Sequence, residues 1–149
     1  MGPGEASDEQ AAAAEQVGRL IAEAGALLVC GGLGGVMEAA CRGAAEAGGL
    51  SIGLLPGLRR DEGNPWLGVV VPTGMGEARN ALVVRAADAV VAVGGGWGTL
   101  SEVALALKTG KPVVGIATWE LAKAGKAVEG IVRARSPAEA VARVLELVV

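Results

Sequence analysis

Residues 89–102 constrain the fold of this chain more than any other stretch. A run of small apolar residues, 89–93, predicts a buried strand, and glycines crowd the next five positions, 94–98. Residues 99–107 then place apolar side chains at helical spacing, which predicts a helix. A glycine-rich turn between a strand and a helix leaves backbone N–H groups free at the positive end of the helix dipole, and this geometry binds phosphate or another anion. The sequence therefore predicts an anion-binding turn, although it lacks both the Gly-Lys-Ser/Thr of a Walker loop and a full dinucleotide fingerprint.

Strand and helix patterns alternate along the rest of the chain. Short aliphatic runs predict strands at residues 26–30, 51–55, 67–71, 89–93, 112–116 and 130–133. Helical patterns separate them at residues 7–23, 34–47, 77–87 and 99–107, and a last helix begins at the serine cap Ser136. Continuous aliphatic strands that alternate with helices are typical of a parallel sheet covered on both faces. We expect one α/β domain over residues 1–149, with a doubly wound, Rossmann-like parallel sheet.

Ligands of such sheets bind beyond the carboxyl ends of the strands, where the winding reverses. Two glycine-rich turns fall at strand ends, at residues 31–35 and 94–98, and Arg79 follows a third strand end. An arginine there could hold a phosphate or a sugar hydroxyl with its planar bidentate fork. Two plainer interpretations stay open. The turn at residues 31–35 could only pack a helix tightly against its strand, and Arg79 could be a surface charge.

The composition narrows the classes of partner. The net charge is −3 and no basic block occurs, which argues against nucleic acid as a partner. There is no signal peptide and no apolar run of about 18 residues, so we expect a soluble, cytoplasmic protein with no membrane partner. Histidine is absent, which removes the usual metal ligand and the commonest general base, and no metal site is expected. Cys30 and Cys41 are not spaced as a redox or zinc pair and are interpreted as small buried residues.

Three motifs carry a resemblance to a known family. Residues 95–102, Gly-Gly-Trp-Gly-Thr-Leu-Ser-Glu, are similar to the P-G-G-x-G-T-x-x-E signature of the LOG or "lysine decarboxylase-like" family, Rossmann-like proteins that bind nucleoside monophosphates. Arg79-Asn80 stands upstream at the distance where that family carries an Arg-Lys pair. Residues 30–37 resemble the family's G-G-G-x-x-G-L-M turn. Within the family, the chain looks closest to a small bacterial branch near the molybdenum-cofactor carriers.

The resemblance implies a set of site residues. The family's catalytic arginine and glutamate match Arg79 and Glu102, and in the resembling enzymes they act together on the bond between base and ribose. A carboxylate can position water and stabilise positive charge on the sugar, and a helix N-terminus is expected to keep its pKa low. Residues 99–102 also match a capping box, in which Glu102 would only reach back to a backbone N–H. The other predicted ligand-binding residues are Gly32, Gly34, Gly35, Asn80, Gly95, Gly96, Trp97, Gly98 and Thr99.

Two departures from the motif leave more than one function open. Gly94 replaces the signature proline, and Asn80 replaces the lysine, which removes a positive charge beside the expected ligand phosphate. The first hypothesis is an enzyme resembling LOG, which hydrolyses a nucleoside 5′-monophosphate to free base and ribose 5-phosphate and requires no cofactor. The alternative is a non-catalytic carrier or sensor of a small phosphorylated ligand, such as a nucleotide or the molybdenum cofactor. Lysine decarboxylation is not supported, because no lysine has a context suited to a pyridoxal phosphate Schiff base.

The resemblance also predicts a gap in the sheet and an assembly. Proteins of the family place an apolar strand, normally at the middle of the sheet, before the first glycine turn. Residues 1–4, Met-Gly-Pro-Gly, cannot form one, and Ser7 caps a helix soon afterwards. We expect the first central strand to be missing, as from a truncated reading frame, with two sheet edges unpaired. Relatives of this kind form at least dimers, so a homodimer or homotetramer is expected.

Overall fold

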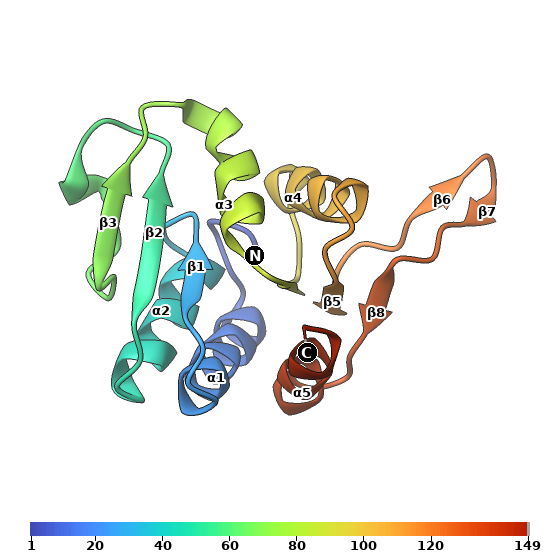
Figure 1. Cartoon of the computed structure of the whole chain (residues 1–149), viewed down its shortest axis with the longest axis horizontal. Helices are drawn as coiled ribbons and strands as arrows, with labels where there is room; N and C mark the ends of the chain where they lie inside the picture. The colour runs from blue at the N-terminus through green and yellow to red at the C-terminus, as the bar shows by residue number, and fades with distance from the viewer. Residues whose placement is uncertain (149) are drawn as a thin grey trace.

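The computed structural model describes residues 1–148 and has α/β architecture. The helices are α1 (Asp8–Glu23), α2 (Val36–Glu46), α3 (Asn80–Ala86), α4 (Trp97–Lys108) and α5 (Pro137–Leu147), with the short 3-10 turns η1 (Arg60–Glu62) and η2 (Gly76–Arg79). The strands are β1 (Leu28–Cys30), β2 (Ser51–Leu55), β3 (Val69–Pro72), β4 (Val90–Val93), β5 (Val113–Ile116), β6 (Ala122–Lys123), β7 (Lys126–Ala127) and β8 (Ile131–Arg133). Helices α1, α2 and α5 lie on one side of the main strands, and α3 and α4 lie on the other (Figure 1). The predicted fold class is confirmed.

The parallel strands form two separate halves. One half has the order β1-β2-β3 and the other β4-β5-β8, and every neighbouring pair in them is parallel. Within the described residues no hydrogen-bonded pairing joins β1 to β4, and the N-terminus lies between these two edges (Figure 1). The amino group of Met1 donates to the Val91 carbonyl at 2.6 Å, and the Met1 carbonyl accepts from the Val93 N–H at 2.8 Å. The expected gap at the centre of the sheet is therefore present, with Met1 at one end of it.

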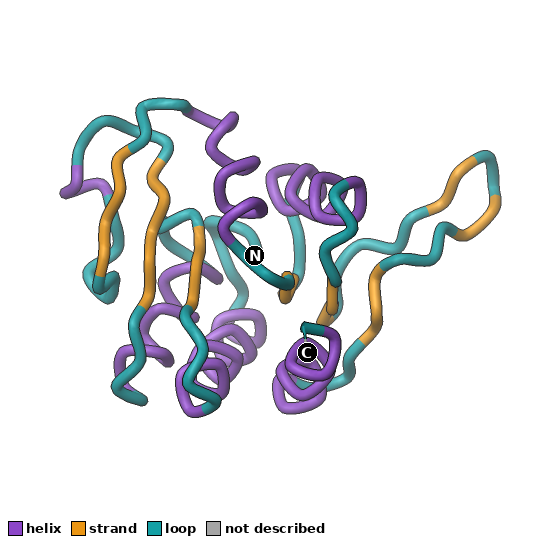
Figure 2. Tube along the Cα trace, in the orientation of Figure 1, coloured by secondary structure: helices purple, strands orange, loops and turns teal. Residues whose placement is uncertain are grey.

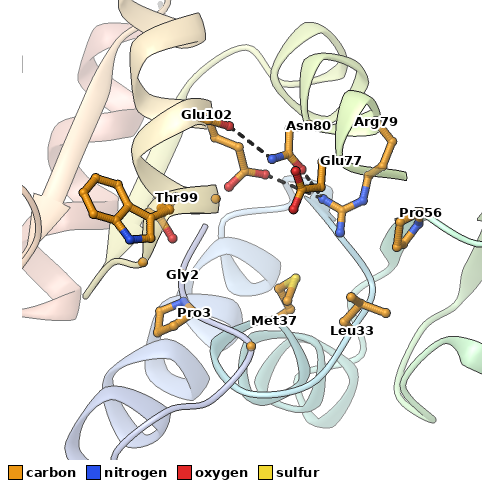
Figure 3. Close-up of a pocket in the computed structure, with 15 residues that line it drawn as sticks. Gly2, Pro3, Leu33, Met37, Pro56, Glu77, Arg79, Asn80, Thr99 and Glu102 are labelled. Carbon is orange, nitrogen blue, oxygen red and sulfur yellow. Dashed lines mark hydrogen bonds and ion pairs between the residues drawn. The ribbon is translucent and has the colours of Figure 1, made fainter. Parts of the chain in front are cut away.

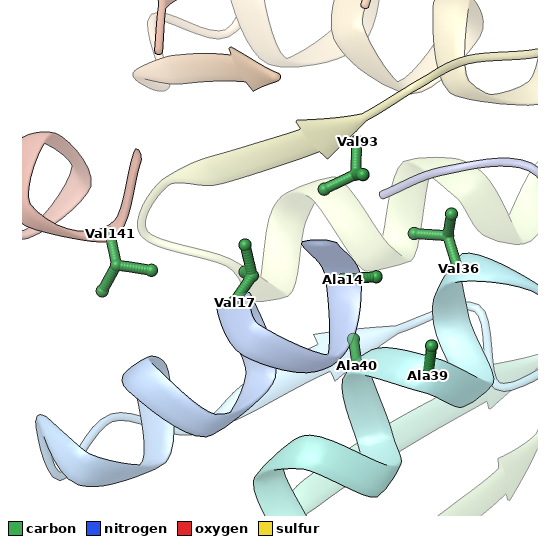
Figure 4. Close-up of a cluster of buried hydrophobic side chains, with 7 residues drawn as sticks. All are labelled: Ala14, Val17, Val36, Ala39, Ala40, Val93 and Val141. Atoms are coloured by element: carbon green, nitrogen blue, oxygen red, sulfur yellow. The ribbon is translucent and has the colours of Figure 1, made fainter. Parts of the chain in front are cut away.

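Valine and alanine build the core, because the chain has no phenylalanine or tyrosine. One cluster joins α1, α2, β4 and α5 through Ala14, Val17, Val36, Ala39, Ala40, Val93 and Val141 (Figure 4). Helices α1 and α2 approach so closely that a Cβ on Gly18 would overlap the Ala40 carbonyl, and one on Gly43 would overlap the Glu15 carbonyl. Small side chains at the helix contact replace the large aromatic residues that fill other cores.

Three local features differ from the sequence expectations. Helix α4 begins at Trp97, two positions before the predicted start, and the predicted helix at residues 77–87 divides into η2 and α3. The hairpin β6–β7 was not expected, because its Ala-Lys-Ala-Gly-Lys-Ala sequence has little strand propensity. Positive φ angles at Ala124 (52°) and Gly125 (78°) give it the tight turn that suits a two-residue hairpin. The hairpin projects from the body of the protein (Figure 2).

Candidate functional site

The glycine loop between β4 and α4 leaves the start of a helix uncapped. Gly96 is the N-cap of α4, and no side chain bonds to the helix start. The first intrahelical backbone bond runs from the Leu100 N–H to the Gly96 carbonyl, at 3.0 Å. The N–H groups of Trp97, Gly98 and Thr99 therefore have no partner within the helix and lie at the positive end of its dipole. This is the arrangement that the glycine pattern predicts for anion binding.

Two polar atoms near this helix start are buried without a partner. They are the Oγ1 atom of Thr99, whose residue is 3% exposed, and the Nε atom of Arg79, whose residue is 7% exposed. A buried polar atom without a hydrogen bond is costly and uncommon in folded proteins. Both residues line the same cavity, so a polar ligand there could supply the missing partners.

Arg79 is held inside the protein at the junction of η2 and α3. Its guanidinium lies against Gly31, where an added Cβ would come within 2.6 Å of Nη2. Nη1 donates to the Asn80 side-chain oxygen at 2.6 Å, and the Asn80 amide donates to Ser101 Oγ at 3.2 Å. Burial lowers the pKa of Arg79, although an arginine stays charged in proteins. The interpretation of Arg79 as a surface charge is wrong.

Glu102 faces Arg79 across the cavity. The Arg79 Nη1 and Glu102 Oε1 atoms are 4.0 Å apart, and both side chains are under a tenth exposed. Burial raises the pKa of Glu102, against the opposing effects of the N-terminal amino group and Arg79. The expected low pKa is wrong, because removal of the carboxyl from water outweighs the attraction of these two positive charges. The capping-box alternative is also wrong, because α4 starts at Trp97 and Thr99 already lies within the helix.

These side chains border a cavity of about 480 Å³ (Figure 3). Its walls come from residues 2–4, from Leu33 in the first glycine turn and Met37 after it, from Pro56, from Glu77, Arg79 and Asn80, and from the start of α4. The cavity lies beyond the carboxyl ends of the strands, as expected for a doubly wound sheet. Its volume is within the range of small-molecule sites, roughly 300–1,000 Å³.

The structure brings together most of the predicted site residues. Those that line the cavity are Arg79, Asn80, Gly96, Trp97, Gly98, Thr99 and Glu102. Those that do not line it are Gly32, Gly34, Gly35 and Gly95.

The glycines outside the cavity contact the protein itself. Gly35 has a φ of 63°, and a Cβ there would overlap the Pro3 carbonyl. Gly32 has a φ of 76° and would place a Cβ 2.6 Å from a Leu55 methyl group. Gly95 lies against the indole of Trp119, which donates to the Gly96 carbonyl at 3.2 Å. The glycines of the turn at residues 31–35 thus have a packing role, and Leu33 of the same turn lines the cavity, so the turn combines features of its two interpretations.

The sequence reasoning missed one wall of the cavity. Gly2, Pro3 and Gly4 line it, and the Pro3 carbonyl accepts from the Val36 N–H at 3.1 Å. The signal was present, because a Gly-Pro-Gly turn just before a capped helix mirrors the other glycine turns. Its interpretation only as a failed strand concealed its position at the site.

The two cysteines contact each other in the core. Their Sγ atoms are 3.5 Å apart, and Cys30 and Cys41 are 5% and 0% exposed, which confirms that both are buried. The hydrogen bond between the thiols raises the pKa of Cys30 and lowers the pKa of Cys41 to about 7.

Within residues 1–148 no cluster of three histidine, cysteine, aspartate or glutamate side chains could hold a metal ion. No helix in that range is long and apolar enough to cross a bilayer.

Comparison with known proteins identifies the family. Residues 1–141 match the profile of the SLOG cluster4 family. The chain belongs to this family. An uncharacterized protein of Archaeoglobus fulgidus is 44% identical over 141 residues, which are 95% of this chain and 89% of that protein.

Solved structures agree with this SLOG cluster4 assignment. The molybdenum cofactor binding protein of Rippkaea orientalis is similar to this chain at 38% identity, with a TM-score of 0.89 over 100% of this chain and 94% of that one. A Moco carrier protein of Chlamydomonas reinhardtii is 40% identical, with a TM-score of 0.85 over 99% of this chain and 93% of that one. The chain is thus a LOG-like Rossmann protein close to the Moco carriers, as its motifs predicted.

Proposed function

We propose that this SLOG cluster4 protein is a carrier that binds the molybdenum cofactor, a phosphorylated pterin. The ligand would lie in the cavity lined by Arg79 and the start of α4, which we call the crevice. The observation that carries the proposal is the convergence of three features on one cavity: the free N–H groups of α4, the unpartnered Thr99 hydroxyl and the buried Arg79. The similar solved structures named as molybdenum-cofactor binding and carrier proteins support the same ligand.

The phosphate of the ligand is the group that these residues suit best. Free N–H groups at a helix start favour an anion, and a guanidinium adds a charge that does not titrate away. The Thr99 hydroxyl could donate to a phosphate oxygen and so gain the hydrogen-bond partner that it lacks within the protein. Asn80 keeps Arg79 in place through the bond at 2.6 Å without adding a second positive charge.

The flat pterin suits the mouth of the crevice. Trp97 is 80% exposed beside the helix start, and its ring centre lies 5.4 Å from that of Trp119. Exposed indole faces stack readily on flat heterocycles. The ligand would then bind by its phosphate inside and by its ring at the opening.

The protein has few side chains that could coordinate the molybdenum of the bound cofactor. The chain has no histidine, and both cysteines lie in the core and do not line the cavity. A carrier that holds only the organic part of its cargo can release it without breaking a bond between metal and protein. This property suits delivery to another protein.

Retention of molybdenum tests the proposal. The protein is mixed without oxygen with cofactor released from a molybdenum enzyme, passed through a gel-filtration column and analysed for molybdenum. We expect equimolar retention, and Arg79→Met should weaken binding by about tenfold or more, because it removes a charged hydrogen-bond donor. Arg85→Met, on the exposed face of α3, is the matched control and should retain the metal like the parent. If the parent elutes without molybdenum, the carrier proposal fails.

One observation favours a second candidate, hydrolysis of a nucleoside 5′-monophosphate. Glu102 is buried, has a raised pKa and lies 4.0 Å from Arg79, which suits a carboxyl that exchanges a proton during a reaction. In that reaction water would add to the sugar carbon as its bond to the base breaks, and the base would leave with a proton. Incubation with AMP and chromatography for adenine tests it. Adenine that disappears in Glu102→Gln would support the hydrolase, and no adenine from the parent would exclude AMP as its substrate.

A further inference from the structure

Cys30 and Cys41 form a pair of thiols that the proposed function does not use. Cys30 is the last residue of β1, and Cys41 lies in the middle of α2. Their Sγ atoms are 3.5 Å apart, and both residues are buried. Because a disulfide bond is about 2.05 Å long, the two sulfur atoms would need to approach by only about 1.5 Å to form one.

Cys41 has the chemistry of an attacking sulfur. The hydrogen bond from Cys30 lowers the pKa of Cys41 to about 7 against the effect of burial, and Asn64 and Ser51 act in the same direction. The thiolate is the nucleophilic form of cysteine, so a substantial fraction of Cys41 is reactive near neutral pH. The pKa of Cys30 is raised, which keeps a protonated thiol beside it. The pair thus combines an attacking sulfur with a second thiol that can complete a disulfide.

The β1 side of the pair has more freedom to move than the α2 side. The Ala40 carbonyl and the backbone of Gly43, which flank Cys41, lie directly against the backbone of α1. Cys30, in contrast, is followed by two glycines at residues 31–32, whose backbone adjusts readily. We therefore expect the end of β1 and the turn after it to supply most of the movement.

This turn reaches the crevice. The Gly32 N–H donates to Cys30 Sγ at 3.3 Å, so the turn is bonded to the sulfur itself. The Arg79 guanidinium lies against Gly31, and Leu33 lines the crevice. A shift of the turn would therefore change the position of one wall and the support of Arg79.

Asn64 makes a second connection between the cysteine pair and the turn. It is a buried polar residue whose N–H donates to the Gly32 carbonyl at 2.9 Å and whose side-chain amide donates to the Leu33 carbonyl at 3.1 Å. The same side chain hydrogen-bonds Cys41 and contributes to its low pKa. A change at the Cys41 sulfur is thus transmitted to the turn through Asn64 as well as through Cys30.

We propose that Cys30 and Cys41 are a modification site, a dithiol that hydrogen peroxide closes to an internal disulfide, and that this closure shifts the turn at residues 31–33 beside Arg79. First, the Cys41 thiolate attacks one peroxide oxygen and the O–O bond breaks. Cys41 becomes a sulfenic acid, and the departing hydroxide takes up the proton that the thiol had released. The Cys30 sulfur then attacks the Cys41 sulfur, the S–O bond breaks, and a second water leaves with the Cys30 proton. The two sulfur atoms together lose two electrons, which the peroxide gains.

Other roles suit the pair less well. A structural zinc ion takes four ligands, and within residues 1–148 no group of three candidate ligands is found. The burial of the pair also selects the oxidant. Hydrogen peroxide is small and uncharged, whereas a large charged disulfide such as oxidised glutathione cannot reach sulfur atoms whose residues are 5% and 0% exposed. Thiols that only fill the core would stay reduced in peroxide.

The intact mass after peroxide treatment tests the disulfide. The 149-residue protein is treated with an excess of hydrogen peroxide, cleared of peroxide with catalase and unfolded in an alkylating reagent. We expect the mass to fall by two hydrogen atoms with neither cysteine alkylated, and dithiothreitol should restore both alkylation sites. Cys30→Ser and Cys41→Ser are the matched controls. Each keeps one thiol, which can gain oxygen but cannot close an internal disulfide.

The treated parent decides the question without any substitution. Alkylation of both cysteines would overturn the proposal, and so would a disulfide between two molecules in place of the internal one. NMR measures the shift of the turn separately. The signals of the Leu33 N–H and the Arg79 Nε–H should move on oxidation, whereas the Ala140 N–H in α5 should keep its position. An unchanged Arg79 signal in the disulfide form would contradict the connection to the crevice.

The effect on binding rests on the proposed function. Reduced and oxidised protein, both free of peroxide, are compared in the molybdenum-retention experiment. We expect the oxidised form to bind at least about fivefold more weakly, because Arg79 loses the support of Gly31. Equal retention by the two forms contradicts this coupling. If neither form retains molybdenum, the carrier proposal fails, and the mass and the Arg79 signal still decide the fate of the cysteine pair.

Discussion

The two glycine-rich turns of this protein look alike in the sequence and differ in the structure. In the turn at residues 31–35, glycine leaves room for other parts of the protein, namely the Arg79 guanidinium, a Leu55 methyl group and the Pro3 carbonyl. In the loop at residues 94–98, Gly96 has no other part of the protein within 4 Å of a built Cβ, and Gly98 has only the Asn80 amide at 4.0 Å. Gly31, Gly32 and Gly35 thus pack against other parts of the protein, as do Gly94 and Gly95, whereas Gly96 and Gly98 line the cavity.

This comparison shows that a glycine cluster after a strand does not by itself indicate which of its glycines pack against the protein and which border a ligand cavity. The turn at residues 31–35 contributes Leu33 to the cavity, and its glycines accommodate Arg79 and the N-terminal wall. In the loop at residues 94–98, Gly96, Trp97 and Gly98 line the cavity. Substitution of Gly35 should therefore act on stability, and substitution of Gly98 should act on ligand binding.

The largest effect is expected for Gly35→Ala. Its φ of 63° and the overlap of a new methyl group with Pro3 and Gly4 should lower the free energy of unfolding by about 2–4 kcal/mol. Gly34→Ala is the control within the same turn, because its Cβ would lie at an ordinary 3.5 Å from the nearest atom. Urea unfolding of both variants measures the difference. Equal losses would remove the packing explanation for this turn.

Gly98→Ala should weaken ligand binding without lowering the stability of the protein. Gly98 lies in the first turn of α4 with room for a methyl group, so stability should stay the same or rise by about 0.5–1 kcal/mol. The methyl group would enter the cavity near the free N–H groups, and we expect ligand affinity to fall about tenfold, or about 1.4 kcal/mol. Calorimetric unfolding and molybdenum retention measure the two effects separately. A variant that loses stability but binds normally would break the contrast between the turns.

The pH dependence of stability should separate Glu102 from the rest of the site. A carboxyl whose pKa is raised by folding favours the folded state while it is protonated, below about pH 4.3, its usual value in an unfolded chain. That contribution is lost as the pH rises through the folded-state pKa. The stability of Glu102→Gln minus that of the parent should therefore grow between pH 4 and pH 7. Urea unfolding at both pH values checks the sign, and a difference that shrinks would show that Arg79, not burial, dominates the carboxyl.

The smallest effect on stability is expected for Trp97→Ala. Its side chain is largely in solvent, so the free energy of unfolding should change by no more than about 0.5 kcal/mol. Ligand binding should still weaken, because the stacking face at the mouth is lost. Titration with the ligand, followed by the fluorescence of the remaining tryptophans, measures the binding. Unchanged affinity would limit the site to the helix start and Arg79.

Much of the fold and of the site was predictable from the sequence. Aliphatic runs between helical patterns predicted the parallel strands, because runs such as β4 and β5 are largely buried between the two helix layers. The order of the motifs correctly predicted that Arg79 and Glu102 would meet, since both follow strand ends on one edge of the sheet. The gap between β1 and β4 within residues 1–148 was also predictable, because Gly2-Pro3-Gly4 cannot pair as a strand.

Properties that depend on three-dimensional surroundings were not predictable. The direction of the Glu102 pKa shift follows from burial, which local sequence does not report. The role of Gly35 depends on Pro3, which is far away in the chain and comes close only through the packing of α1 on α2. The contact between Cys30 and Cys41 joins a strand end to the middle of a helix, a pairing that their spacing alone does not indicate.

The close approach of α1 and α2 determines how the crevice can adapt to its ligand. Gly18 and Gly43 bring the two helix backbones into direct contact, so neither helix can slide or tilt without a collision. Residues 2–4 and 31–35 form one wall of the crevice, joined by the bond from the Val36 N–H to the Pro3 carbonyl. The opposite wall carries Arg79 and Asn80 on η2 and the short helix α3, together with the start of α4, and we expect any opening or closing of the crevice to come from movement on that side.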